Sequence, residues 1–181
     1  LVNHEILIEK LFACGIRGLA LDWFISYLTN RKQMVEITYR NGKTNVITNH
    51  LSCQQGISYG VPQGSILGPV LFLIYINDLG TFIKHGKPTF FADDTSIFLS
   101  GDSVGNIQTD ISNTVNQILQ WFEKNRLIIN TEKTVALSFH HTQNSNSHCP
   151  IIKLGNKSIQ YKGSTKFLGI WLDESLKWST H

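Results

Sequence analysis

The sequence has little of what marks chains outside the globular class. Its 181 residues include only 4 prolines and no Gly/Ser-rich or Pro-rich tract, which excludes collagen-like, low-complexity and disordered chains. The longest apolar run, Ile66 to Ile76, is interrupted by Gly68 and Pro69 and is too short to span a bilayer. With 41% hydrophobic residues, we expect a soluble domain with one core.

Cysteine is also scarce. Cys14, Cys53 and Cys149 are odd in number, widely separated and outside any CxxC or Cys/His pattern, which argues against a disulfide framework and a zinc site. The histidines of the polar loop at 140–148 have irregular spacing, so we expect them to be solvated. Reduced cysteines and the lack of a signal peptide predict an intracellular protein, and an opening without methionine is typical of a fragment.

Charge is only mildly unbalanced, with 16 Lys and Arg against 13 Asp and Glu. Basic residues gather between Arg126 and Leu172, where Glu132 is the one acidic residue. A polyanion could be held there, although a solvated lysine-bearing face is the simpler explanation of this stretch alone. The basic residues are Arg126, Lys133, Lys153, Lys157, Lys162 and Lys166.

Hydrophobic spacing and turn residues predict mixed secondary structure. The first half is expected to hold a helix capped by Asn3 and ended by Gly15, a helix over Leu19–Leu28, a hairpin of strands 34–39 and 44–51 around Asn41-Gly42, an extended segment at 57–59, and a buried helix over Ile66–Leu79.

The second half is expected to contain one long helix and several strands. Its elements are a hairpin of 89–92 and 95–98 connected by Asp93-Asp94, an amphipathic helix from Asp102 to about Leu127, strands at 135–139, 151–154 and 158–161, and a last strand over Lys166–Leu172. Helices packed on an antiparallel sheet make the predicted fold class α+β.

The adjacent aspartates are the sharpest chemical feature. We expect Phe90, Phe91 and Ala92 to bury the approach, so that Asp93 and Asp94 hold two like charges at an exposed turn. This arrangement is costly unless a cation is present, and Mg²⁺ prefers hard oxygen ligands of this kind. A metal site is indicated, but Asp is also a common turn residue, which suffices as an explanation without further context.

That context comes from the segment Gly60-Val-Pro-Gln-Gly-Ser65. Its glycines and proline predict a backbone that a ligand can approach, Gln63 offers an amide, and the next helix would begin with N–H groups that attract phosphate. Such a loop can cradle a nucleotide, although alone it is also an ordinary strand-to-helix turn.

Together these segments resemble a known family. The strings Gly60-Val-Pro-Gln-Gly-Ser-Ile-Leu-Gly-Pro-Val-Leu-Phe72, Ile76-Asn-Asp-Leu79 and Phe91-Ala-Asp-Asp94 closely resemble reverse transcriptases of non-LTR retrotransposons, especially jockey-like elements. Further landmarks follow in the family's order along nearly the whole chain: Asn3-His4, Gly15-Ile-Arg-Gly18, Trp23, Ser26-Tyr-Leu28, Arg31, Gln33, Trp121, Leu127, Asn130, Lys133-Thr134, Phe167-Leu-Gly-Ile170, Asp173, Leu176 and Trp178.

The resemblance implies a right-hand polymerase palm that is incomplete at its N-terminus. Residues 1–165 would form the palm with part of the fingers, and residues 166–181 the primer-grip strand and the start of the thumb. It implies RNA-directed DNA synthesis in target-primed retrotransposition, with two Mg²⁺ ions (Mn²⁺ as an alternative), an RNA template, a DNA primer and dNTPs. The implied compartments are the nucleus and cytoplasm, with no membrane.

The resemblance also implies roles for single residues. Asp93 and Asp94 would be catalytic metal ligands, and Lys133 would approach the triphosphate to offset or protonate the leaving group, unless it is simply an exposed loop lysine. The substrate-binding set is Pro62, Gln63, Gly64, Ser65, Phe91 and Ala92. Phe167, Leu168 and Gly169 would grip the primer terminus, unless they are core or turn residues of a hairpin.

The family's first metal-binding Asp lies upstream of the part that matches Leu1-Val-Asn-His4, so we expect this piece alone not to polymerise. The competing hypothesis is an inactive truncated relic that at most binds RNA through its basic surface. A viral RNA-copying polymerase or an intron-encoded maturase shares the palm, but the Phe-Leu-Gly-Ile strand and the spacing from Asn130 to Lys133 weigh against the viral case.

Overall fold

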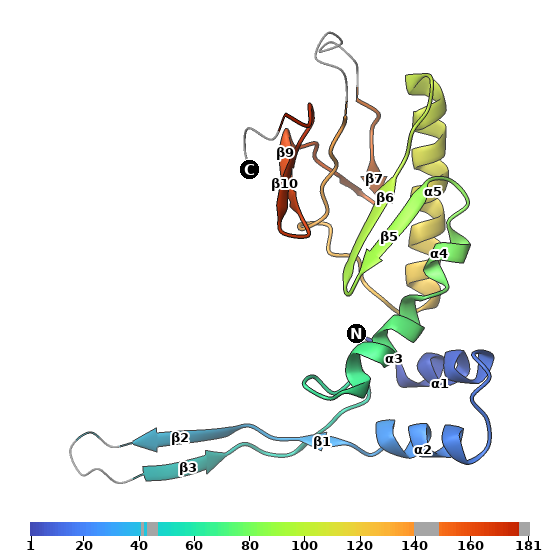
Figure 1. Ribbon diagram of the computed structural model, residues 1–181. Helices are drawn as coiled ribbons and strands as arrows, with labels where there is room; N and C mark the ends of the chain where they lie inside the picture. Colours follow the sequence, from blue (N-terminus) through green and yellow to red (C-terminus); the bar gives the residue numbers. More distant parts are fainter. Residues whose placement is uncertain (41, 43–46, 140–148, 178–181) are drawn as a thin grey trace. The chain divides into compact units, whose positions relative to one another are not determined.

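The computed structural model describes residues 1–40, 42, 47–139 and 149–177 (Figure 1). The chain divides into two compact units, Leu1–Asn77 and Asp78–His181, each of which is described by itself. Helices and short antiparallel hairpins confirm the α+β class. Within the described ranges the strands form five two-stranded sheets rather than one antiparallel sheet, because each of these strands pairs with a single partner.

The first unit opens with two helices at the predicted places, α1 (His4–Ala13) and α2 (Leu19–Leu28). Asn3 caps α1 as expected, since its side-chain oxygen accepts a hydrogen bond from the N–H of Ile6 at 3.1 Å. The chain leaves α1 through Gly15, whose φ of 96° lies in the left-handed region that favours glycine.

Helix α3 (Leu67–Ile76) completes the core of this unit. α1 packs against both α2 and α3. The predicted helix over Ile66–Leu79 is too long, because the chain leaves α3 at Asn77-Asp78 before the short helix α4 (Leu79–Phe82) of the second unit. It is also buried on one side only, and Val70 and Leu73 are about half exposed. The core side chains, each at most 1% exposed, are Leu7, Leu11, Leu28, Leu71 and Tyr75.

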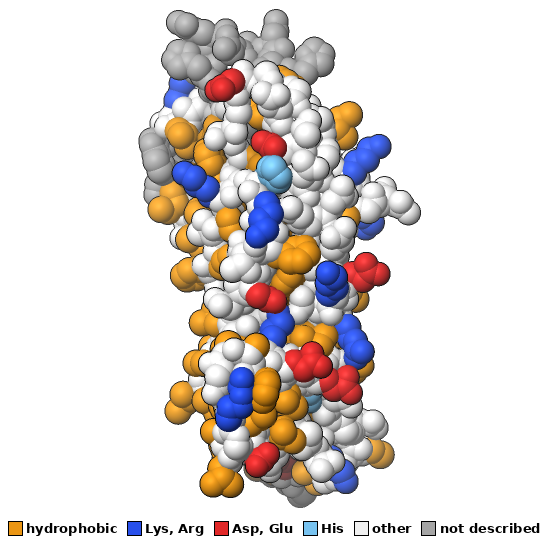
Figure 2. All heavy atoms as spheres, turned by 90° about the vertical axis from the view of Figure 1, so that its right-hand side faces the viewer, with side chains coloured by type: hydrophobic (Ala, Val, Ile, Leu, Met, Phe, Trp, Pro, Cys, Tyr) orange, Lys and Arg blue, Asp and Glu red, His pale blue; other side chains and the backbone are white. Residues whose placement is uncertain are grey.

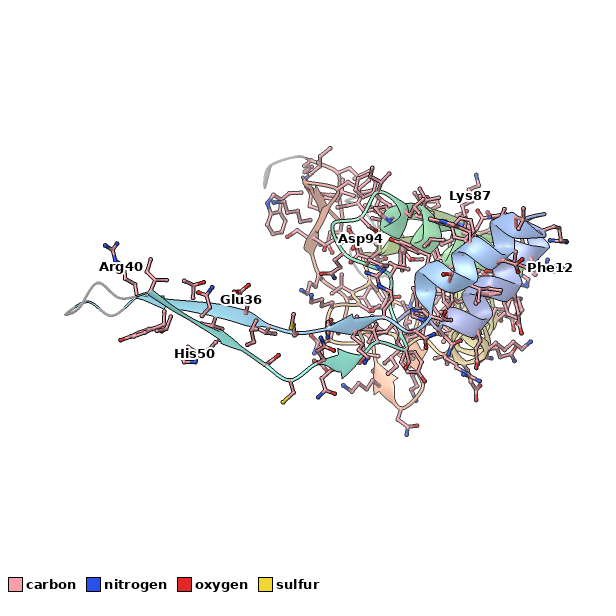
Figure 3. The ribbon with its side chains drawn as sticks, turned by 90° about the horizontal axis from the view of Figure 1, so that it is seen from below. Phe12, Glu36, Arg40, His50, Lys87 and Asp94 are labelled. Atoms are coloured by element: carbon pink, nitrogen blue, oxygen red, sulfur yellow. The ribbon has the colours of Figure 1, made fainter. Side chains whose placement is uncertain are left out.

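Two strand pairs follow α2. Every residue of the longer pair is exposed, so the alternation predicted for strands 34–39 and 44–51 buries neither face. Figure 3 shows Glu36, Arg40 and His50 along this hairpin, which extends away from the helices of its unit. Most of the predicted Asn41-Gly42 turn lies outside the described residues. The pairs are β1 (Lys32–Gln33) with β4 (Gln55–Gly56), and β2 (Glu36–Arg40) with β3 (Ile47–Leu51).

The second unit is built around α5 (Val104–Lys124), the predicted amphipathic helix. Ile111, Thr114 and Trp121 are its buried residues. Ser103 caps it rather than the predicted Asp102, because the Ser103 side chain accepts a hydrogen bond from the N–H of Asn106 at 3.2 Å. No helix in the described part of the chain is long and apolar enough to cross a membrane.

The strand pair β5 (Lys87–Phe91) and β6 (Asp94–Phe98) is preceded by a segment held on α5. The Thr114 hydroxyl donates to the carbonyl of His85 at 3.1 Å, and the N–H of Lys84 donates to the Gln117 side chain at 2.9 Å. Two polar helix residues therefore fix the chain just before it enters β5.

Two smaller hairpins end the described chain. The pair β7 (Lys153–Leu154) and β8 (Lys157–Ser158) turns at Gly155-Asn156, as expected. The predicted strand over Lys166–Leu172 is instead the hairpin of β9 (Ser164–Phe167) and β10 (Ile170–Asp173). It turns at Leu168 and Gly169, whose φ values of 47° and 89° suit a two-residue connection.

One predicted strand in this part of the chain is wrong, and one predicted loop is untested. The strand at 135–139 is reduced to a single bridge from Ala136 to Tyr161. The histidine loop at 140–148 lies outside the described residues.

The cap of α5 gives a direct stability test. Ser103→Ala should lower the free energy of unfolding by about 1 kcal/mol, because the N–H of Asn106 loses its partner. Asp102→Ala removes no cap and should change it by less than about 0.5 kcal/mol. Urea unfolding of the two variants measures both values, and equal losses would show that Ser103 is not the cap.

Candidate active site

The two aspartates lie at the tip of the β5–β6 hairpin, one residue away from the predicted arrangement. Phe91 pairs with Asp94, so Ala92 and Asp93 form the connection and Asp94 already belongs to β6. The predicted Asp93-Asp94 connection is therefore wrong. Ala92 has a φ of 52°, and a positive φ at the first turn residue suits the twist of antiparallel strands.

The register also decides which side chains accompany Asp94. Paired residues share a face of the hairpin, so Asp94 lies on the same face as Phe91. Phe91 is 62% exposed and Ala92 is exposed. The expectation that these two residues are buried just before the aspartates is therefore wrong. Phe90, on the opposite face, is the half-buried anchor, with its ring against Gly80.

Both carboxylates are open to ligands. Asp93 and Asp94 are exposed, and neither makes a hydrogen bond or ion pair with any residue that the structure describes (Figure 3 labels Asp94). Carboxylate oxygens with open lone pairs are the donors that Mg²⁺ prefers, so these residues fit two ligand positions of a divalent ion. No group of three or more His, Cys, Asp or Glu suited to a metal occurs in the described ranges.

The loop over Gly60–Ser65 is fixed at its C-terminal end by Ser65. The Ser65 hydroxyl donates to the carbonyl of Pro62 at 2.7 Å and accepts from the N–H of Gly68 at 3.0 Å. Between these anchors Gln63 is exposed, and Gly64 has a φ of 79° that a residue with a side chain rarely adopts. The amide of Gln63 is therefore presented on a constrained backbone.

The start of α3 is less open to phosphate than predicted. The N–H of Gly68 is already bonded to Ser65, and Pro69 has no N–H. Two of the amides expected to attract an anion are thus unable to do so, because the loop uses one and the sequence removes the other.

Lys133 lies on a turn just after α5. Its N–H donates to the carbonyl and the side chain of Asn130, both at 3.2 Å, and the Thr134 hydroxyl donates to the same carbonyl at 2.8 Å. The Lys133 side chain is exposed. Asn130 therefore orients the turn, and no described residue forms an ion pair with the Lys133 side chain.

The basic surface is partly neutralised. Glu132 pairs with Lys157, and this hydrogen bond and charge hold the pKa of the Glu132 carboxyl below its usual value. Figure 2 shows one face of the molecule, on which Lys and Arg side chains are interspersed with Asp and Glu. Within the stretch from Arg126 to Leu172, the Glu132–Lys157 pair offsets one of the basic charges. The remaining exposed lysines of the stretch are Lys133, Lys153, Lys162 and Lys166.

The predicted primer-grip residues form the tip of the β9–β10 hairpin. Phe167 is half-buried, whereas Leu168 and Gly169 are exposed at the turn. At the end of β10, Asp173 is buried and its carboxylate accepts hydrogen bonds from the Ser175 hydroxyl at 2.8 Å and the Lys177 N–H at 3.1 Å. Asp173 therefore orders the chain after β10.

The predicted site residues belong to different units. The loop at 60–65 lies in the first unit, and Asp93, Asp94, Lys133 and the tip at 167–169 lie in the second. No hydrogen bond or ion pair in the described chain joins either aspartate to Lys133 or to that tip. Their convergence into one site stays a prediction.

Comparison with known proteins identifies the family. A sequence profile described as "Reverse transcriptase (RNA-dependent DNA polymerase)" matches residues 1–172. This chain belongs to the reverse transcriptase family. The match runs through the loop, the aspartate hairpin and the β9–β10 tip, and so contains every predicted site residue.

Curated relatives place this reverse transcriptase segment near those of non-LTR retrotransposons. It is 30% identical over 142 residues to the RNA-directed DNA polymerase from mobile element jockey of Drosophila melanogaster, covering 75% of this chain and 15% of the relative. It is 25% identical over 181 residues to the probable RNA-directed DNA polymerase from transposon BS of the same species, covering 96% of this chain and 18% of the relative.

A third relative is the retrovirus-related Pol polyprotein from type-1 retrotransposable element R1 of Bradysia coprophila, at 26% identity over 165 residues, or 87% of this chain and 15% of the relative. The chain therefore spans less than a fifth of the length of these relatives. The predicted resemblance to jockey-like reverse transcriptases is confirmed.

Gly68 offers a matched test of the loop's packing. A Cβ at Gly68 would meet the Pro62 carbonyl oxygen at 2.6 Å, whereas one at Gly105 would meet nothing within 4 Å. Both are the second residue of their helix. Gly68→Ala should destabilise the protein by about 1–3 kcal/mol, and Gly105→Ala should stabilise it by up to about 1 kcal/mol. Urea unfolding compares the two, and changes of the same sign would contradict the contact.

The Glu132–Lys157 pair predicts a small pH effect. Because the pKa of Glu132 is lowered in the folded state from its ordinary 4.5, the pair stabilises the fold above that pH, and its contribution disappears as the pH falls through the lowered pKa. Glu132→Gln should therefore be less stable than the parent at neutral pH and equal to it in acid. The difference should be small and reduced by salt, since both side chains are exposed. A variant difference that persists in acid would contradict this assignment.

Proposed function

We propose that this chain is the palm segment of an RNA-directed DNA polymerase of a non-LTR retrotransposon, and that the longer protein copies RNA onto a DNA primer in target-primed retrotransposition. Residues 1–165 are the palm with part of the fingers, and 166–181 the primer grip and the start of the thumb. The observation that carries the proposal is the adjacent pair Asp93 and Asp94 at an exposed hairpin tip, in a chain that matches the reverse transcriptase family over residues 1–172.

Asp93 and Asp94 are the residues that hold divalent metal. Their exposed oxygens match the hard donors that Mg²⁺ and Mn²⁺ prefer, and two like charges on neighbouring residues favour a bound cation. When bound, two such ions supply Lewis-acid stabilisation of the primer 3′-oxygen and the departing pyrophosphate. The family resemblance implies that Asp93 would be the ligand that contacts both ions.

The other residues orient the substrates. Pro62, Gln63, Gly64 and Ser65 contact the incoming dNTP and the template base, and Gln63 is supported in this role by its exposed amide on a constrained loop. Phe91 and Ala92 extend the substrate surface beside the aspartates. Phe91 is supported by its exposed position on the face of Asp94.

Lys133 acts on the leaving pyrophosphate, and the β9–β10 tip acts on the primer terminus. The ammonium group of Lys133 offsets or protonates the leaving pyrophosphate, and its exposed position on an ordered turn supports this role. Phe167, Leu168 and Gly169 hold the primer terminus, with exposed Leu168 and Gly169 available for the contact. The partners are an RNA template, a DNA primer and dNTPs.

An inactive relic that at most binds RNA is the second candidate. It is favoured by the exposed lysines that follow α5, which could contact a polyanion: Lys133, Lys153, Lys162 and Lys166. Polyanion binding that falls steeply with salt and ignores Mg²⁺ would support this candidate.

Substitution of the aspartates in the longer polymerase that contains this segment tests the proposal. Asp93→Asn should reduce Mg²⁺-dependent extension of an RNA-templated primer by roughly 10²–10³-fold, as removal of one preorganised electrostatic group does in other enzymes. Asp94→Asn should reduce it by less, because the family resemblance implies that Asp93, and not Asp94, would contact both ions. Steady-state primer extension with purified protein measures both effects.

Asp102→Asn is the matched control, since it makes the same chemical change at an exposed position that lies outside the site. It should extend primers at the parent rate. If Asp93→Asn extends as fast as Asp102→Asn, the metal assignment is wrong. If the parent itself shows no extension with either Mg²⁺ or Mn²⁺, the relic is the correct alternative.

A further inference from the structure

One buried histidine has no role in the site described so far. His4, the first residue of α1, is only 9% exposed. Its Nε2 atom lies 2.7 Å from the carbonyl oxygen of Gly60. A carbonyl oxygen only accepts hydrogen bonds, so this contact requires the proton on Nε2. His4 therefore donates across 56 positions of sequence to the first residue of the Gly60–Ser65 loop.

Two backbone contacts hold the same junction. The N–H of Gly60 donates to the carbonyl of Val2 at 2.6 Å, and Tyr59 forms a bridge with Asn3. The His4 contact thus completes a set in which both backbone polar groups of Gly60 are satisfied by residues 2–4.

The junction is itself tied to α3. The N–H of Asn3 donates to the Tyr75 hydroxyl at 3.3 Å, and the ammonium group of Lys10 donates to the Tyr75 carbonyl at 2.6 Å. Tyr75 is fully buried. The first end of the loop is therefore anchored to the core of its own unit.

The second end is anchored by Ser65, which bridges Pro62 and Gly68. Between Gly60 and Ser65 only residues 61–64 remain, and Gln63 is exposed among them. Gly60 has a φ of 88°, a conformation that glycine adopts readily and other residues rarely adopt. Because glycine restricts its own backbone least, this conformation depends on the groups that hold its N–H and carbonyl. Val2 holds Gly60 through its backbone carbonyl, and His4 holds it through its side chain.

We propose that His4 is a positioning residue that acts through Gly60 to fix the Gln63 amide for the incoming nucleotide. The proposal rests on the proposed function, in which Gln63 contacts the dNTP. With the Nε2–H donor present, the loop is ordered before the nucleotide arrives. Without this donor, the Gly60 carbonyl accepts a hydrogen bond from water instead, and nucleotide binding must then order the loop.

The expected effect is on nucleotide binding rather than on chemistry, since His4 touches no reacting atom. In the longer polymerase, His4→Leu should raise the KM for dNTP by about 5–30-fold, the effect of losing one hydrogen bond that preorganises a site, with kcat changed by less than about threefold. His4→Gln keeps an N–H donor at similar reach and should return KM to within about threefold of the parent. Steady-state primer extension over a range of dNTP concentrations measures both constants.

Glu9→Gln is the matched control on the same helix, because Glu9 is exposed and lies outside the site. Its KM and kcat should equal those of the parent. If His4→Leu shifts KM no more than Glu9→Gln, or if His4→Gln is as impaired as His4→Leu, the proposal is overturned.

A double-mutant cycle with Gln63→Ala separates positioning from a general loss of stability. If His4 acts through Gln63, His4→Leu should raise KM by less than twofold once Gln63 is already alanine. A fold-change equal to that in the parent background would show that His4 does not act through Gln63. The cycle compares the KM for dNTP of the parent, the two single variants and the double variant.

A spectroscopic test does not depend on activity. The ¹⁵N chemical shifts of the His4 ring in the folded protein should show a proton on Nε2, and a neutral ring with its proton on Nδ1 alone would overturn the contact. Should His4→Leu fail to fold, this measurement and His4→Gln still decide the proposal. An Asp93→Asn variant with parental activity overturns the proposed function instead, so the two failures are distinguishable.

Discussion

The hydrogen-bond register between β5 and β6 is the constraint on which the candidate site depends. Pairing Phe91 with Asp94 leaves Ala92 and Asp93 as the connection, and this places the two carboxylates in different backbone settings, one in the turn and one in the strand. Since neighbouring strand residues face opposite ways, a register shifted by one residue would move Asp94 to the anchoring face of Phe90. The turn geometry at Ala92, with its positive φ, fixes the register.

The loop at 60–65 solves a different physical problem. A loop that exposes a polar side chain must do so without leaving its own backbone groups unsatisfied. Here Gly60 is satisfied by Val2 and His4, and the Ser65 hydroxyl both donates to Pro62 and accepts from Gly68. The Ser65 anchor uses the N–H of Gly68, and Pro69 has no N–H, so the start of α3 is less open to an anion than the sequence indicates. In the proposed function, contact with the nucleotide would then depend on the displayed Gln63 side chain.

Family membership and geometry contribute separate parts of the argument. The profile match establishes a reverse transcriptase segment, and the relatives establish its kinship with non-LTR retrotransposon enzymes. Neither shows which residues act. The exposed carboxylates, the ordered turn of Lys133 and the constrained Gln63 supply physical grounds for roles in metal binding, leaving-group stabilisation and nucleotide contact. The chain covers less than a fifth of the three relatives named above, so catalysis is a property to be tested in the longer protein.

The sequence by itself determined the local elements and the family. The cap at Asn3, the limits of α1 and α2 and the apolar stripe of α5 follow from capping chemistry and helical periodicity, which act over a few residues. Only the tertiary structure decided that the connection between β5 and β6 lies one residue earlier than expected, that Lys166–Leu172 folds back at Leu168-Gly169, and that His4 reaches Gly60. These features depend on which of several near-equivalent pairings or partners wins. That choice is made by contacts between residues far apart in the chain, which a local pattern does not contain.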